Sequence, residues 1–144
     1  MFNSVLVVCM GNICRSPTGE RLLRRQLPNL KITSAGIGAL VGKPAAPLSI
    51  EVAIKHGLSL DHHVAKQINK LSCQTNDLIL VMERRHSELV CKISPESRGK
   101  IMLFGHWLNQ SEIPDPYGKS IEAYEFAYNK LNESALKWAE MLSK

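Results

Sequence analysis

A short run of apolar, mostly β-branched residues at Ser4–Cys9 (SVLVVC) most constrains how this chain can fold. Uninterrupted runs of this kind are typical of strands that are buried on both faces of a parallel sheet. A helical pattern follows at Thr18–Leu27, where leucines are interspersed with charged residues. Because parallel strands can be joined only by long crossover connections, this order of strand, loop and helix predicts an α/β fold.

The same alternation continues along the 144-residue chain. Three further segments have the pattern of strands, at Lys31–Ala35, Asp77–Met82 and Lys100–Phe104. Four further segments have the pattern of helices, at Leu48–Gly57, Val64–Leu71, Arg84–Ile93 and Ser120–Leu142. The pattern predicts a single domain over residues 1–144, with a four-stranded parallel sheet and helices on both of its faces. Ligands of such sheets bind beyond the carboxyl ends of the strands, and the first such end follows Cys9.

The charge balance favours an anionic partner. The chain has 18 lysine and arginine residues against 13 aspartate and glutamate residues, a net charge of +5. The basic residues are scattered at helical spacing, which is typical of solvated helix faces rather than of a nucleic-acid-binding surface. The N-terminal sequence MFNSVLVVCM has no basic residue before its apolar run, and that run is too short for a signal peptide or a membrane span. We therefore expect a cytoplasmic protein without nucleic-acid binding or membrane insertion.

The four cysteines, Cys9, Cys14, Cys73 and Cys91, show no metal-binding or redox motif. No Cys-x-x-Cys pair occurs, and no cluster of cysteine and histidine has the spacing of a zinc site. In a cytosolic protein the expected state is four free thiols, without a metal or another cofactor. A special role for any of these cysteines must therefore follow from its surroundings.

Residues 9–17 (CMGNICRSP) link the first strand to the first helix and have the composition of an anion-binding loop. Ser16 and Pro17 are favoured as the N-cap and the first residue of a helix, so we expect the helix to begin there. Gly11 and Asn12 tolerate left-handed backbone conformations, which would turn successive amides inward. The loop predicts a site for a phosphate-sized oxyanion at a helix N-terminus, and it lacks the Walker A pattern of an Mg-nucleotide site.

Cys9 and Arg15 are the candidate reactive pair of this loop. A thiol beside a helix N-terminus and a guanidinium is expected to ionise to a nucleophilic thiolate. The planar fork of Arg15 can hold two equatorial oxygens of a phosphate. The alternative is that Cys9 is a buried small hydrophobic residue, but its position between a strand and an anion-binding loop favours the nucleophile.

Phosphoryl transfer to a thiolate also needs an acid for the leaving group. Asp115, in the segment IPDPY at 113–117, is the best candidate because it follows the fourth predicted strand and its loop is stiffened by two prolines. The local sequence equally fits an Asp-Pro turn, in which the carboxylate only begins the turn.

The segments CMGNICRSPTGE and IPDPY resemble those of the low-molecular-weight protein tyrosine phosphatases. The resemblance extends through 33–36 (TSAG), 63–68 (HVAKQI) and 77–82 (DLILVM), and 103–107 (LFGHW) makes the chain most similar to the Wzb-type enzymes of bacterial capsule and exopolysaccharide clusters. It implies metal-independent hydrolysis of phosphotyrosine through a phosphocysteine. The implied roles are Cys9 as nucleophile, Arg15 as phosphate clamp and Asp115 as acid; Met10, Gly11, Asn12, Ile13, Cys14 and Ser16 as the phosphate-binding loop; and Asn12, Ser34 and His63 as residues that brace the loop.

The resemblance also suggests the substrate. Leu40 and Tyr117 are the expected walls of the pocket, and Leu40 stands where many members have an aromatic residue. Gly118 follows Tyr117 where the animal enzymes have a second tyrosine. The implied partner of this expected monomer is a phosphotyrosine protein, namely the tyrosine-rich C-terminal tail of a membrane tyrosine autokinase. Cys14 is a candidate to capture an oxidised Cys9 as a disulfide.

Two other functions remain open from the sequence. Arsenate reductases of the same fold also use a Cys-x5-Arg loop, but they relay a disulfide to closely spaced cysteines, and Cys73 and Cys91 are far apart in sequence. A non-catalytic module that binds phosphotyrosine is the second alternative, and the presence of Cys9, Arg15 and Asp115 together argues against it.

Overall fold

The computed structural model describes residues 2–143 and confirms the predicted fold. Four parallel strands form one sheet in the order β2–β1–β3–β4. The strands are β1 (Ser4–Cys9), β2 (Lys31–Gly36), β3 (Leu78–Val81) and β4 (Ile101–Leu103). The helices are α1 (Arg15–Gln26), α2 (Pro47–Lys55), α3 (Lys70–Thr75), α4 (Arg84–Ile93) and α5 (Ile121–Leu142), with a 3-10 helix η1 at Pro95–Lys100.

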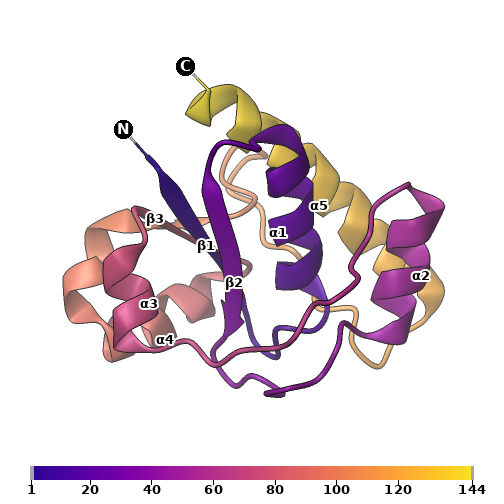
Figure 1. Ribbon diagram of the computed structural model, residues 1–144, viewed down its shortest axis with the longest axis horizontal. Helices are drawn as coiled ribbons and strands as arrows, with labels where there is room; N and C mark the ends of the chain where they lie inside the picture. The colour runs from indigo at the N-terminus through magenta and orange to yellow at the C-terminus, as the bar shows by residue number, and fades with distance from the viewer. Residues whose placement is uncertain (1, 144) are drawn as a thin grey trace.

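Helices cover both faces of the sheet, as Figure 1 shows with α1, α2 and α5 on one side and α3 and α4 on the other. The side chains of β1 alternate between two cores because successive residues of a strand point to opposite faces. Val5 and Val7 pack into the larger core with α1 and α5, and Leu6 and Val8 pack into the smaller one. Burial on both faces explains why Ser4–Cys9 contains no charged residue.

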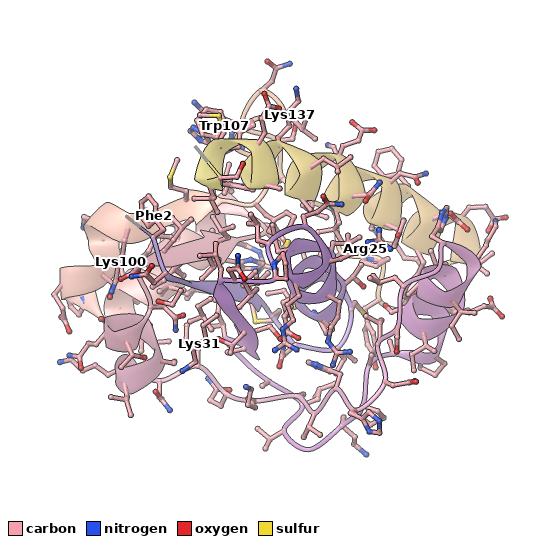
Figure 2. The ribbon with its side chains drawn as sticks, turned by 45° about the horizontal axis from the view of Figure 1, so that its top comes forward. Phe2, Arg25, Lys31, Lys100, Trp107 and Lys137 are labelled. Atoms are coloured by element: carbon pink, nitrogen blue, oxygen red, sulfur yellow. The ribbon has the colours of Figure 1, made fainter. Side chains whose placement is uncertain are left out.

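The long helix α5 closes the larger core. Its apolar positions 124, 128, 131, 135 and 138 are all buried. Trp138 donates a hydrogen bond from Nε1 to the carbonyl oxygen of Phe104 at 2.8 Å, which ties α5 to the segment after β4. Figure 2 shows Trp107 over the C-terminal part of α5, and its ring centroid is 5.6 Å from that of Trp138. Within residues 2–143, no helix combines the length and the apolar character needed to cross a membrane.

One predicted helix was wrong. The chain at 64–69 is irregular, with one parallel bridge from Gln67 to Gly36 of β2, and only Lys70–Thr75 is helical. The amide of Gly36 donates to the carbonyl oxygen of Lys66 at 2.8 Å, and the amide of Ile68 donates to the carbonyl oxygen of Gly36 at 2.9 Å. This pairing satisfies backbone groups at the edge of the sheet, and that tertiary gain outweighs the local helical pattern. Asn69 then caps α3 by accepting from the amide of Ser72 at 2.8 Å.

Candidate active site

The phosphate-binding loop joins β1 to α1 at the edge of the sheet where the parallel strands end (Figure 1). Cys9 is the last residue of β1, and α1 begins at Arg15 with Cys14 as its N-cap. The prediction that Ser16 would be the N-cap and Pro17 the first helical residue was therefore wrong. Pro17 lies in the first turn, where amides have no partner within the helix, so the helix can begin earlier at no cost in hydrogen bonds.

The sharp turn of the loop is at Asn12, whose φ is 58°. Gly11 does not have a positive φ, contrary to the expectation for this residue. The glycine that the loop requires is Gly36 of β2, because a Cβ there would lie 2.6 Å from the carbonyl oxygen of Met10 and 3.0 Å from the backbone nitrogen of Asn12. The absence of a side chain at position 36 lets the loop pack directly against β2.

A buried chain of hydrogen bonds connects the nucleophile candidate to β2. Cys9 Sγ is 2.9 Å from Ser16 Oγ, and Asn12 Nδ2 donates to Ser16 Oγ at 2.7 Å and to Ser34 Oγ at 3.1 Å. Ser34 Oγ in turn donates to Glu20 Oε1 at 2.7 Å. The thiol therefore lies at the end of a connected network that orients the Ser16 hydroxyl toward it.

His63 and the segment after it hold Asn12 from the other side. His63 Nε2 donates to the carbonyl oxygen of Asn12 at 2.7 Å, and the amide of Lys66 donates to Asn12 Oδ1 at 2.9 Å. Burial lowers the pKa of His63, so its imidazole is neutral at pH 7 with the proton on Nε2. The left-handed turn at Asn12 is thus fixed by contacts to both its backbone and its side chain.

Arg15 is the most deeply buried charged side chain near the loop, with 1% of its surface exposed. Its Nη1 donates to Glu83 Oε2 at 2.6 Å and to the carbonyl oxygen of Ile113 at 2.8 Å. Its Nε has no hydrogen-bond partner among the described residues. The guanidinium is therefore held on one edge by protein groups, and it retains a donor that can serve an oxyanion.

Glu83 contacts Arg15 and His86 lies behind Glu83; neither residue was predicted from the sequence. Burial opposes ionisation of Glu83, but hydrogen bonds from Arg85 and Arg15 outweigh it and lower the pKa of the carboxyl. His86 is fully buried, with Nε2 at 3.6 Å from Glu83 Oε2. Burial, together with the charge of Arg15, lowers the pKa of His86 to about 4. The position of Glu83 after β3, at the carboxyl edge of the sheet, was the available signal.

The pocket itself is a cleft of about 200 Å³. It brings together the three residues expected to react, Cys9, Arg15 and Asp115, with the expected walls, Leu40 and Tyr117. The other lining residues are Met10, Gly11, Ile13, Cys14 and Gly38. Asn12 and Ser16 belong to the loop, but neither they nor Ser34 and His63 line the cleft; all four make the contacts described above.

Asp115 makes the contact of an Asp-initiated turn and also lies beside Arg15. Its Oδ1 accepts a hydrogen bond from the amide of Tyr117 at 3.1 Å, which is the contact of an Asp-initiated turn. Its Oδ2 lies 3.7 Å from Arg15 Nη2, and 45% of its side chain is exposed. The turn holds one carboxylate oxygen, so the other faces the pocket and the guanidinium.

Cys14 is a buried thiol in the same loop. Its Sγ is 3.8 Å from the hydroxyl of Tyr124 on α5. Burial raises the pKa of the Cys14 thiol to about 11, so this sulfur is protonated at neutral pH. Capture of an oxidised Cys9 by Cys14 stays a prediction, and a protonated thiol would make that step slow.

Comparisons with known proteins agree with this geometry. Residues 4–144 match the family of low molecular weight phosphotyrosine protein phosphatases. The chain is 59% identical over 143 residues to the low molecular weight protein-tyrosine-phosphatase Wzb of Escherichia coli K12, covering 99% of this chain and 97% of that protein. The crystal structure of the tyrosine phosphatase AmsI of Erwinia amylovora superposes with a TM-score of 0.98 at 57% identity, covering 100% of this chain and 95% of the other. Wzb of Vibrio vulnificus, solved with benzylphosphonate, has a TM-score of 0.96 at 50% identity, covering 98% and 99%.

Proposed function

Because the chain belongs to the low molecular weight phosphotyrosine protein phosphatases, a family of cysteine-based enzymes, we propose that it hydrolyses phosphotyrosine through a phosphocysteine on Cys9. The observation that carries this proposal is the convergence of Cys9, Arg15 and Asp115 on one cleft. The walls of that cleft, Leu40 and Tyr117, are apolar or aromatic and suit the ring of a phosphotyrosine.

In the first step the Cys9 thiolate attacks phosphorus in line with the tyrosyl oxygen. The P–O bond to the tyrosine breaks as the S–P bond forms, and protonated Asp115 gives its proton to the departing phenolate. Arg15 and the amides of the loop stabilise the charge on the equatorial oxygens. The contacts of Arg15 to Glu83 and Ile113 support this role because they fix the fork before substrate binds.

In the second step water attacks the phosphocysteine and gives its proton to the Asp115 carboxylate. The S–P bond breaks, inorganic phosphate leaves and Cys9 returns as a thiolate. Ser16 stabilises that thiolate, a role supported by the 2.9 Å distance between the hydroxyl and the sulfur. This cycle needs no metal because the guanidinium and the amides neutralise the phosphate.

The proposed physiological substrate is the tyrosine-rich C-terminal tail of a membrane tyrosine autokinase that acts in capsule or exopolysaccharide production. The similarity to Wzb and AmsI supports this proposal, and the net charge of +5 suits a phosphorylated tail. The enzyme is proposed to act as a monomer.

The mechanism is tested with Cys9→Ser. This variant should lose turnover of p-nitrophenyl phosphate but still bind vanadate, because Arg15 and the amides remain. Cys73→Ser is the matched control, since Cys73 is also buried but lies on α3 and should leave the rate unchanged. Substantial activity of Cys9→Ser would overturn the phosphocysteine.

The partner and the alternatives are tested separately. Immobilised Cys9→Ser should retain the phosphorylated kinase tail and release it when vanadate is added. An arsenate reductase would instead reduce arsenate with thioredoxin. A binding module would capture the tail, but the wild-type protein would turn over neither the phosphorylated tail nor arsenate. Either of those results would replace the proposed function.

A further inference from the structure

A second cleft of about 540 Å³ opens directly beside the phosphate pocket. The two clefts share three lining residues, Ile13, Leu40 and Tyr117. The remaining lining comes from the segment before α2 and from its first turn, namely Lys43, Pro44, Ala45, Ala46, Pro47 and Ile50. A substrate chain that leaves the phosphate pocket over Leu40 and Tyr117 therefore enters this second cleft.

The lining is apolar except at one place. Lys43 is the charged residue of the cleft, and among residues 2–143 no carboxylate lies within 4.0 Å of its ammonium group. The catalytic cycle proposed above uses neither Lys43 nor Ile50. The cleft thus presents an apolar surface with one available positive charge at its edge.

The wall of the cleft is fixed to the phosphate-binding loop. The amide of Leu40 donates to the carbonyl oxygen of Gly11 at 3.1 Å, and the amide of Ala46 donates to the carbonyl oxygen of Ile13 at 2.8 Å. The carbonyl oxygen of Lys43 accepts from the amide of Ala65 at 2.9 Å. A surface that is already ordered loses less conformational entropy when a ligand binds, which favours recognition.

Resting on the proposed function, we infer that this cleft is a subsite for the substrate chain beside the phosphotyrosine. It takes one large aliphatic or aromatic side chain against Pro44, Pro47 and Ile50, and Lys43 pairs with a neighbouring carboxylate of the substrate. Continuity with the phosphate pocket and the charge of Lys43 select this occupant. The apolar side chain and the carboxylate both belong to the peptide, so the cleft would distinguish protein substrates from small aryl phosphates.

The apolar part is tested with phosphotyrosine peptides of glycine and serine, in which leucine is placed at each of the two positions before and after the phosphotyrosine. In the wild type, one placement should raise kcat/KM about tenfold, which is less than full burial of a leucine supplies. Ile50→Gln should bring that ratio close to one. Ile54→Gln is the matched control, because Ile54 lies one turn further along α2, is 65% exposed and does not line the cleft.

The charged part gives a second test that does not disturb packing. A glutamate beside the favoured leucine should raise kcat/KM about threefold, consistent with an exposed ion pair. Lys43→Glu should reverse this preference in favour of lysine, whereas Lys92→Glu on the distant helix α4 should not.

The outcomes separate the two proposals. If the wild type hydrolyses the glycine–serine peptide and no leucine placement changes kcat/KM, the subsite is refuted and the phosphatase assignment stands. If Ile54→Gln abolishes the preference as fully as Ile50→Gln, the subsite is also refuted. If neither the peptides nor p-nitrophenyl phosphate are hydrolysed, the proposed function falls and the subsite falls with it.

Discussion

Two buried polar clusters hold the phosphate-binding loop, and they differ in how fully their hydrogen bonds are made. On the β2 side, Asn12, Ser16, Ser34 and Glu20 form a connected network. On the β3 side, Arg15 donates to Glu83, and Oε2 of Glu83 lies 3.6 Å from Nε2 of His86. There Arg15 Nε and both ring nitrogens of His86 have no hydrogen-bond partner within residues 2–143.

This difference gives the two clusters different roles: one sets the shape of the phosphate-binding loop, and the other stabilises charge. A satisfied network in a low-dielectric interior is rigid and specifies one conformation, so the β2 side sets the geometry of the loop. Buried polar groups that lack partners cost stability, and they are retained where they have another use. We therefore assign charge stabilisation to the β3 side, where an oxyanion in the cleft can accept a hydrogen bond from Arg15; His86 does not line the cleft. Variants on each side can test this division between shape and charge.

Arg15→Lys should have the largest effect because an ammonium cannot replace the fork that reaches both Glu83 and the substrate. We expect kcat/KM for p-nitrophenyl phosphate to fall by roughly 10²–10³-fold, the usual loss for one oxyanion-stabilising group. Circular dichroism should show a folded protein. A loss of less than about threefold would make Arg15 a structural residue and remove the basis of the comparison.

Asp115→Asn should act through the leaving group. Phenyl phosphate needs protonation of its departing oxygen, so its rate should fall by about 10²-fold, near the lower end for general acids. p-Nitrophenyl phosphate has a better leaving group and should lose much less. Equal losses on the two substrates would show that Asp115 only holds the turn to Tyr117.

Ser34→Ala should reveal the shape-setting side. It removes the buried hydrogen bond that Asn12 Nδ2 donates to Ser34 and the one that Glu20 Oε1 accepts from it, so the free energy of unfolding should fall by about 1–3 kcal/mol. Ser134→Ala is the matched control, because the hydroxyl of Ser134 is buried without a partner among the described residues. Urea denaturation should show a change within about 0.5 kcal/mol for the control. Similar losses in both variants would contradict the importance of the network.

The smallest effect concerns pH. Because the folded-state pKa of His86 is lowered to about 4, the unfolded chain binds its proton first as the pH falls below about 6.5. The stability contributed by neutral His86 is therefore present above pH 6.5 and lost toward pH 4, by about 1 kcal/mol between pH 6.5 and 5.5. His63, whose pKa is also lowered, adds to the same slope. His86→Asn should flatten the dependence measured by urea denaturation; an unchanged slope would mean that His86 is not a source of acid sensitivity.

Local pattern was sufficient where an element is determined by its own residues. The strand at Ser4–Cys9 and the helix at Ser120–Leu142 were predicted within a residue, because each carries the periodicity of its own burial. The helix predicted at Val64–Leu71 was wrong because the conformation of this segment depends on pairing with β2. The need for glycine at position 36 was not predicted, since the carbonyl oxygen that requires it belongs to Met10 on another strand's loop.

The sequence by itself determined the strand, the loop and the helix that carry Cys9 and Arg15, because these residues lie close together in one continuous segment and backbone preference acts over that range. The tertiary structure alone decided what surrounds them. Arg15 finds Glu83 after 68 further residues and the carbonyl of Ile113 after 98, in the segments that follow β3 and β4, which only the order of the sheet brings together. A buried guanidinium needs such partners, and no local spacing encodes contacts of that separation.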